Sequence, residues 1–393
     1  MAPSLLFIPD ISGFTKFVNQ TEITHSRHII AELLQLIVDQ NRLGLTVSEL
    51  EGDAVFFYRD GPLPSSEELL DQSRSMFEAF HAHLKSYEAG RICDCGACST
   101  AHELTLKIVA HAGPIERIAV AGFEKPYGSD VIVTHRLLKN DVPEREYLLM
   151  TDAAFSEEGA PVEPEWSTLC SGSVDVTDVG AVAYRWIPLS PLLEFVPDPP
   201  PPRSFSASHS QYEESIHVDR DPDEVFELLT NFDLRALWNH GVDKLEYEPD
   251  RMNRAGTEHR CVIGNQLIDF ETVGGDFGEG RRGFGEHLTK NPLVHDHVNY
   301  FIVEPEGEGA ASRSTCASGL ASFRFHFSVC SSGAKPVASP RRSWRRSRAR
   351  PNPARGDPNR WKPWRSSRDV SRGGRTTRTR ASIRPTGRHR SGR

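Results

Sequence analysis

The charge of this sequence changes abruptly near residue 310, and this change limits how much of the chain can fold. Residues 1–310 contain 52 acidic and 24 basic residues, whereas residues 311–393 contain 2 acidic and 22 basic ones. A segment rich in Arg, Ser, Pro and Gly buries too little apolar surface to offset the entropy that folding costs. We therefore expect folded domains before residue 311 and a disordered basic tail over 311–393.

A proline-rich run divides the part of the chain that is expected to fold. Residues 197–202 read Pro-Asp-Pro-Pro-Pro-Pro, a composition typical of a stiff, extended linker. The sequence therefore predicts a first domain over 1–195, a linker over 196–210 and a second domain over 211–310.

Charge and apolar content also bear on partners and compartment. No apolar run approaches the roughly 18 residues that a membrane span needs, so no membrane contact is expected. Seven cysteines without a signal peptide are typical of reduced thiols, which favours a cytoplasmic chain. Because residues 1–310 carry a net negative charge, we expect no nucleic-acid binding except through the basic tail.

Two apolar, strand-like runs each carry one aspartate beside a glycine. Asp10 follows Leu5-Leu6-Phe7-Ile8-Pro9, and Asp53 lies in Glu51-Gly52-Asp53-Ala54-Val55. Two buried acids brought together repel each other unless a cation lies between them, and Mg²⁺ favours one or two carboxylates with phosphate oxygens. The pair predicts a magnesium site, whereas for either acid alone a cap or a turn is the better explanation.

A cysteine-rich segment is the second candidate metal site. Cys93, Cys95 and Cys98 place three thiols within six residues, which suits one soft metal such as Zn²⁺, with His102 or Cys170 completing a tetrahedron. The alternative is a turn whose cysteines bind nothing.

Periodicity predicts a mixture of helices and strands in the first domain. An apolar stripe indicates a helix over about 24–41, and Ser65 with Glu68 forms a capping box for another. The alternating segments 104–111 and 116–121 are expected to pair as a hairpin. The predicted fold class is α+β.

Several motifs in this order resemble the catalytic domain of class III adenylyl and guanylyl cyclases over about residues 4–155. They are Asp-Ile-x-Gly-Phe-Thr at 10–15, Gly52-Asp53, and Ala-His-Ala-Gly-Pro at 110–114. With the cysteine segment, the chain is still more similar to an uncharacterised bacterial family of cyclase-like proteins. The resemblance implies a ferredoxin-like antiparallel sheet with helices, assembled as a homodimer.

The resemblance also implies roles for individual residues. In the family, two Mg²⁺ or Mn²⁺ ions bound by the acids matching Asp10 and Asp53, with the carbonyl of Ile11, activate the ribose 3′-hydroxyl of a nucleoside triphosphate. The hydroxyl attacks the α-phosphate and pyrophosphate leaves. Arg136 matches the arginine that stabilises the transition state across the dimer interface.

Three positions depart from the family pattern. Glu49 replaces the lysine that reads the base, Lys125 replaces its acidic partner, and Ile132 replaces an asparagine that orients the ribose. A site that lacks polar partners for its substrate loses discrimination. We therefore expect a catalytically degenerate signalling module that binds metal and nucleotide; the alternative is an active nucleotide cyclase that produces a cyclic monophosphate and pyrophosphate.

The second domain is similar to START-like (SRPBCC) helix-grip domains. A helix opening at Asp221-Pro222-Asp223-Glu224 precedes several strand-like segments up to residue 304, which suggests a curved sheet around a pocket for an apolar small molecule. The closing strands and the long final helix of such domains are missing where the composition changes. We interpret 311–393 as a frameshift product that leaves this helix-grip domain partial; another reading frame of the gene should then encode an amphipathic helix.

Overall fold

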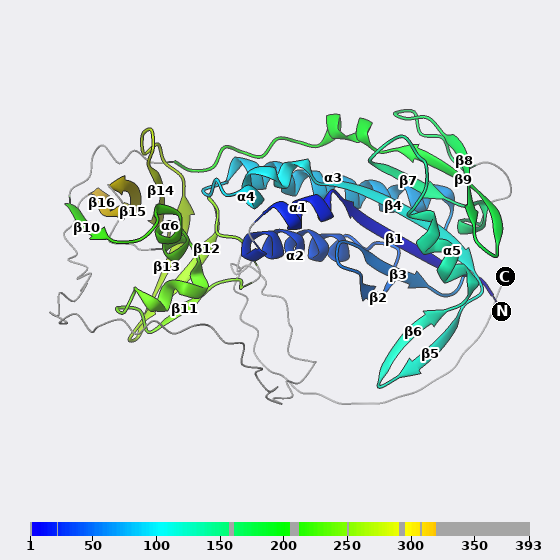
Figure 1. Cartoon of the computed structure of the whole chain (residues 1–393), viewed down its shortest axis with the longest axis horizontal. Helices are drawn as coiled ribbons and strands as arrows, with labels where there is room; N and C mark the ends of the chain where they lie inside the picture. The colour runs from blue at the N-terminus through cyan, green and yellow to red at the C-terminus, as the bar shows by residue number, and fades with distance from the viewer. Residues whose placement is uncertain are drawn as a thin grey trace, which may run out of the picture. The chain divides into compact units, whose positions relative to one another are not determined.

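The computed structural model describes residues 2–21, 23–156, 161–204, 212–249, 251–290, 295–306 and 309–319 (Figure 1). All of these described residues belong to one compact unit. The expected tail, from residue 320 onward, lies outside the described residues. The described part of the chain forms two seven-stranded sheets and one two-stranded sheet.

The first sheet has the strand order β2-β3-β1-β4-β7-β9-β8. The elements of this region are β1 (Ser4–Ser12), α1 (Phe14–Gln20), α2 (Ile23–Asp39), β2 (Thr46–Leu50), β3 (Val55–Arg59), α3 (Ser66–Ala89), α4 (Gly96–Thr100), η1 (Ala101–Glu103), β4 (Thr105–Gly113), β5 (Glu116–Val120), β6 (Phe123–Tyr127), α5 (Ser129–Leu137), β7 (Tyr147–Met150), η2 (Asp152–Ala154), β8 (Cys170–Val176), β9 (Gly180–Pro188) and η3 (Ser190–Phe195).

The first four strands of this sheet have the ferredoxin-like arrangement. Helices connect β1 to β2 and β3 to β4, and the spatial order β2-β3-β1-β4 is antiparallel throughout, as in a split βαβ unit. Strand β7 then pairs parallel to β4, and β9 and β8 follow in antiparallel order. The expected α+β class is confirmed.

Helices cover both faces of this sheet. On one face the apolar stripe of α2, including Ile29, Leu33 and Ile37, is buried with α3 against the sheet. The capping box between Ser65 and Glu68 is present at the start of α3. On the other face, side chains of α5 pack against residues of β1, β3 and β4.

The hairpin expected between residues 104–111 and 116–121 is wrong. Strand β4 is hydrogen-bonded along both edges, to β1 and to β7, so it has no free edge for β5. Strand β5 instead pairs with β6, across a turn in which Ala121 and Gly122 both have positive φ, the geometry of a tight hairpin. This β5–β6 hairpin extends away from the sheet (Figure 1).

The second sheet has the order β10-β16-β15-β14-β13-β12-β11 and is antiparallel throughout. Its elements are β10 (Tyr212–Val218), α6 (Pro222–Thr230), η5 (Phe232–Leu237), β11 (Lys244–Glu246), β12 (Glu258–Ile263), β13 (Gln266–Val273), β14 (Arg282–Leu288), β15 (His295–Glu306) and β16 (Gly309–Gly319). The antiparallel sheet expected here is present, with Asp221 capping α6.

Strand β16 corrects the expected boundary of this region. Its residues pair with β15 on one side and with β10 on the other, so the sheet continues past residue 310 to Gly319. Composition did not indicate this strand, because a paired backbone needs no particular side chains. The frameshift over 311–393 stays a prediction, because backbone pairing does not test the reading frame.

The second sheet also buries charge. The guanidinium group of Arg235 contacts both carboxylate oxygens of Glu286, at 2.7 Å each, and both side chains are almost fully buried. His259 lies 3.5 Å from the same carboxylate. An apolar ligand inside this domain, which stays a prediction, would have to accommodate these polar groups.

Among the described residues, no helix combines the length and apolar character needed to cross a membrane.

Candidate functional site

Asp10 lies near the end of β1, opposite Lys107 of β4. The Nζ of Lys107 is 3.0 Å from Oδ2 of Asp10, and both side chains are mostly buried. The same ammonium group donates to the carbonyl of Leu138 at 3.4 Å. Pairing between β1 and β4 therefore gives Asp10 a positive partner that the sequence analysis did not identify, because the partner is fixed by the register of two distant strands.

Asp53 lies in the hairpin between β2 and β3, beside Asp10. Asp10 forms a β-bridge with Ala54, and the N–H of Ile11 donates to the carbonyl of Asp53 at 2.9 Å. Gly52 turns the hairpin with φ +75°, a backbone conformation that favours glycine. The two runs that the sequence analysis singled out are therefore adjacent in space.

The two acids interact electrostatically. Burial, together with the negative charge of Asp10, raises the pKa of Asp53 to about 6, although Lys107 acts in the opposite direction. The charge of one ammonium group thus acts on two carboxylates. Their excess negative charge is the electrostatic condition that a bound cation would relieve.

Arg136 and Ile132 lie on α5, and both are exposed. Positions four residues apart share one face of a helix, so this face presents an apolar and a cationic side chain together. The neighbouring His135 contacts the hairpin that carries Asp53. Its Nδ1 lies 3.4 Å from Oε2 of Glu51, and its ring packs edge-to-face with Phe56.

Glu49 and Lys125 form an ion pair between β2 and β6. Both residues depart from the expected cyclase pattern, with their signs exchanged. Each charge is therefore neutralised by the other.

A cavity of about 210 Å³ lies beside Gly13, where β1 ends. Lys16 and Arg145 line it, with Glu103 paired to Lys16 at 3.1 Å. Neither cation belongs to a motif that the sequence alone identifies. Lys16 follows the Asp-Ile-x-Gly-Phe-Thr motif directly, and this position was the one available signal.

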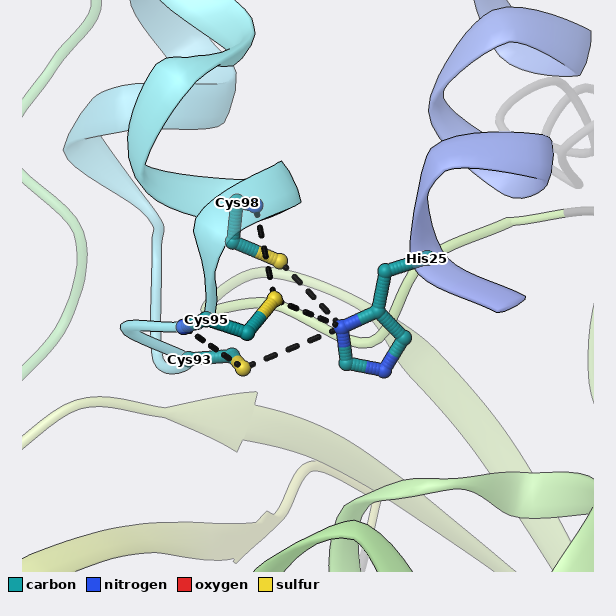
Figure 2. A group of neighbouring side chains, drawn as sticks. All are labelled: His25, Cys93, Cys95 and Cys98. Carbon is teal, nitrogen blue, oxygen red and sulfur yellow. Dashed lines mark hydrogen bonds between the residues drawn. The ribbon is translucent and has the colours of Figure 1, made fainter. Parts of the chain in front are cut away.

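The three cysteines of the second candidate site converge on a histidine that spacing did not reveal (Figure 2). His25, at the start of α2, directs its Nδ1 at the sulfur atoms of Cys95, Cys98 and Cys93, at 3.1, 3.4 and 3.8 Å. All four candidate ligand atoms lie within 4.8 Å of one another.

The expected fourth ligand is therefore corrected to His25. His102 belongs to η1 and Cys170 to β8, and neither is in the cluster. Local spacing could not identify His25, because it precedes Cys93 by 68 residues.

The cluster polarises its thiols. The pKa of Cys93 is lowered by hydrogen bonds from Cys95 and Cys98, and the reciprocal contacts raise the pKa of Cys98. Backbone N–H groups of Cys95 and Cys98 point at the sulfur atoms of Cys93 and Cys95, at 3.5 Å each.

Sequence comparisons connect this chain to proteins whose functions are undefined. A family model described as a protein of unknown function, DUF2652, matches residues 30–147, a range that includes Asp53 and the three cysteines but not Asp10 or His25. The uncharacterized protein Rv2561/Rv2562 of Mycobacterium tuberculosis is 37% identical over 123 residues, which are 31% of this chain. The match spans 57% of that relative, a little over half its length.

Structural comparisons return nucleotide cyclase domains at low similarity. The guanylate cyclase domain of RhGC from Catenaria anguillulae in complex with GTP has a TM-score of 0.36 and 15% identity, and covers 47% of this chain and 96% of its own. The catalytic core of a rhodopsin-guanylyl cyclase with converted specificity, in complex with ATPαS, has a TM-score of 0.35 and 14% identity, and covers 47% and 95%. The adenylyl cyclase CyaB from P. aeruginosa has a TM-score of 0.33 and 12% identity, and covers 47% and 93%.

Proposed function

We propose that the first domain is a cyclase-like signalling module that binds a divalent cation between Asp10 and Asp53 and, with it, the phosphates of a nucleotide. The observation that carries the proposal is the β-bridge between Asp10 and Ala54, which holds two acids from separate runs side by side. Two neighbouring carboxylates suit Mg²⁺ or Mn²⁺, which prefer oxygen ligands and leave other positions for phosphate.

The nucleotide phosphates have a candidate location at the end of the strand that carries Asp10. The cavity beside Gly13 is lined by Lys16 and Arg145, and Gly13 follows Asp10 by three residues. Arginine and lysine side chains are common ligands of phosphate. A cation at Asp10 and Asp53 would supply the further positive charge that a triphosphate requires.

The same module is proposed to be catalytically degenerate. The Glu49–Lys125 pair and the exposed Ile132 occupy positions where a cyclase reads the base and orients the ribose. Without these groups, a bound triphosphate lacks the positioning on which phosphoryl transfer depends. A regulatory role, in which metal and nucleotide binding are themselves the signal, is the consequence.

The module is further proposed to act as a homodimer. Exposed apolar side chains gather on β2, the β5–β6 hairpin and α5, namely Val47, Leu50, Ile118, Val120, Tyr127 and Ile132. An apolar surface of this kind, spread over neighbouring elements, is typical of an interface. Arg136 shares the exposed face of α5 with Ile132, so a second copy that covers this face would also meet the arginine.

Mn²⁺ titration followed by electron paramagnetic resonance tests the cation site. We expect Asp10→Ala and Asp53→Asn to weaken Mn²⁺ binding by at least about tenfold, because each removes a charged ligand. Asp60→Asn is the matched control, since Asp60 lies at the end of β3 and pairs with Ser4 and Arg117. Unchanged Mn²⁺ affinity in both acid variants would reject the proposal.

Pyrophosphate release from a panel of nucleoside triphosphates decides the degree of degeneracy. We expect the wild-type chain to bind a triphosphate in the presence of Mn²⁺ without releasing pyrophosphate above the rate of Asp10→Ala. Release that depends on both Asp10 and Asp53 would instead identify an active cyclase.

A further inference from the structure

Four side chains of the types that bind structural zinc meet at one point of the described chain. Cys93 and Cys95 come from the segment between α3 and α4, Cys98 comes from α4 itself, and His25 comes from the start of α2 (Figure 2). We propose that these four residues form a zinc site in which the protein supplies every ligand. The proposal is independent of the cation site at Asp10 and Asp53, because it uses other residues and a softer metal.

The distances in the cluster match the edges of a zinc coordination tetrahedron. With Zn–S of about 2.3 Å and Zn–N of about 2.0 Å, a regular tetrahedron has sulfur–nitrogen edges of about 3.5 Å and sulfur–sulfur edges of about 3.8 Å. The three Sγ–Nδ1 distances are 3.1, 3.4 and 3.8 Å. The three sulfur–nitrogen edges therefore require adjustments of only a few tenths of an ångström, and all four ligand atoms lie within 4.8 Å of one another.

The orientation of His25 favours metal binding through one particular nitrogen. Its Nδ1 faces the three sulfur atoms, and its Nε2 lies 2.7 Å from Oε2 of Glu227. A metal-bound histidine usually donates its other ring N–H to a carboxylate, which fixes the tautomer and strengthens the ligand. Glu227 has this position and is therefore a positioning residue for the site.

The sulfur atoms also have donors that stabilise thiolates. The hydroxyl of Tyr87 donates to Sγ of Cys98 at 3.1 Å. The backbone N–H groups of Cys95 and Cys98 point at the preceding cysteine sulfurs. Zinc binds the deprotonated thiol, and each of these donors lowers the cost of holding that negative charge.

Burial and ligand number assign a structural rather than catalytic role. His25, Cys93 and Cys98 are buried, and Cys95 is partly exposed. A site with four protein ligands has no open position for water or substrate. Three thiolates also disfavour Mg²⁺ and Ca²⁺, which require oxygen ligands.

The bound ion would connect two parts of the first domain that are far apart in sequence. His25 belongs to the first turn of α2, and Cys93 follows the end of α3. These two helices contact each other over the same face of the sheet. A zinc link at their ends closes a long loop of chain and therefore stabilises the folded state.

Metal analysis of the full chain, purified without chelator or affinity-tag metals, is the first test. We expect one zinc per chain by mass spectrometry of the metal content. After exchange into Co²⁺, we expect the strong visible absorption and the thiolate charge-transfer bands of a tetrahedral, cysteine-bound cobalt ion. Both signals report the site directly and need no enzymatic activity.

Variants of single ligands separate this site from adventitious metal. His25→Ala and Cys95→Ser should lower zinc affinity by at least about a hundredfold, a greater loss than removal of a supporting group causes. Glu227→Gln should lower it by about tenfold. His25→Cys keeps four ligands and should retain zinc, which distinguishes loss of a ligand from loss of the fold.

The chain provides matched controls for both ligand types. His102→Ala and Cys170→Ser remove a histidine and a cysteine that lie outside the cluster, and both variants should keep one zinc per chain. Wild-type chain that holds no stoichiometric zinc and fails to bind Co²⁺ in tetrahedral geometry would overturn the proposal. So would full zinc content in both His25→Ala and Cys95→Ser, or a disulfide between two of the three cysteines in the purified chain.

Discussion

The ammonium group of Lys107 lies 3.0 Å from Oδ2 of Asp10, directly across the β1–β4 pair. A divalent cation shared by Asp10 and Asp53 would bind the same carboxylate of Asp10. Lysine and metal are therefore competitors for the same negative charge, and the affinity of the site for metal depends on how far the lysine can withdraw.

Replacement of Lys107 by glutamine should therefore strengthen cation binding. The variant no longer places an ammonium group beside the divalent ion, so part of their repulsion is removed. We expect the affinity for Mn²⁺ to rise by about tenfold, which corresponds to about 1.4 kcal/mol. Mn²⁺ titration measures the change. Lys125→Gln is the control, because its ammonium group pairs with Glu49 on the hairpin and its loss should leave Mn²⁺ affinity within about twofold. Weaker binding in Lys107→Gln would mean that the lysine organises the acids instead of competing for them.

The exposed apolar surface leads to a prediction about assembly. Val120 is 67% exposed on the β5–β6 hairpin, and a glutamate in its place would bury an unpaired charge if a second copy covers this face. We expect Val120→Glu to weaken dimerisation at least tenfold in sedimentation velocity experiments. Val179→Glu, at a valine that is 50% exposed in the turn between β8 and β9, should sediment like the wild type. If the wild type, Val120→Glu and Val179→Glu sediment equally, the apolar surface is not a dimer interface.

Gly113 allows a close approach between β4 and α5. A Cβ atom on Gly113 would lie 2.1 Å from Cγ of Asp130, whose Oδ1 is 3.2 Å from Nε2 of the buried His111. Gly113→Ala should therefore displace the carboxylate and lower the free energy of unfolding by about 1–3 kcal/mol, measured by urea denaturation.

The double variant separates this clash from other effects of the new methyl group. Once Asp130→Ala has removed the carboxylate, Gly113→Ala should cost less than it does alone, because there is nothing left to displace. If the loss of unfolding free energy in the double variant equals the sum of the losses in the two single variants, the methyl group acts elsewhere.

Local patterns predicted the parts of the fold that depend on neighbouring residues. The capping box at Ser65 and the apolar stripe of α2 are both present, since a helix end and a helix face are set within a few turns of chain. The hairpin expected between residues 104–111 and 116–121 failed for the opposite reason. Proximity in sequence favours such a pairing, but both edges of β4 are occupied by strands that are distant in the chain.

The candidate site residues also separate into those that local sequence identifies and those that depend on distant parts of the chain. The adjacency of Asp10 and Asp53 follows from two strand-like runs whose glycine-containing turn could be recognised from sequence. Lys107 and His25 could not be recognised, because the first depends on strand register and the second lies 68 residues before Cys93. Strand β16 was missed because backbone pairing, unlike burial, leaves no signal in composition.

The last prediction concerns pH and the second sheet. Burial, opposed by Glu286 and reinforced by Arg235, lowers the pKa of His259 from 6.5 to about 4. A neutral His259 therefore stabilises the fold fully above about pH 6.5, and this contribution is lost as the pH falls toward 4, because the unfolded chain takes up the proton first. Between pH 7 and pH 5 the loss is about twentyfold in the unfolding equilibrium, or about 2 kcal/mol.

Hydrogen exchange of the amides in β12–β14 measures this loss when wild type and His259→Phe are compared at each pH, because intrinsic exchange rates then cancel. Phenylalanine keeps the ring contacts of His259 with Phe270 and Phe232 but cannot be protonated, so the ratio of protection should change with pH by the full twentyfold. The lowered pKa of Glu286 acts only below about pH 4.5 and does not enter this window. His217→Gln removes an exposed histidine from β10 and should leave the pH dependence of the wild type intact. A constant ratio between wild type and His259→Phe would mean that His259 is protonated as readily in the folded chain as in the unfolded one.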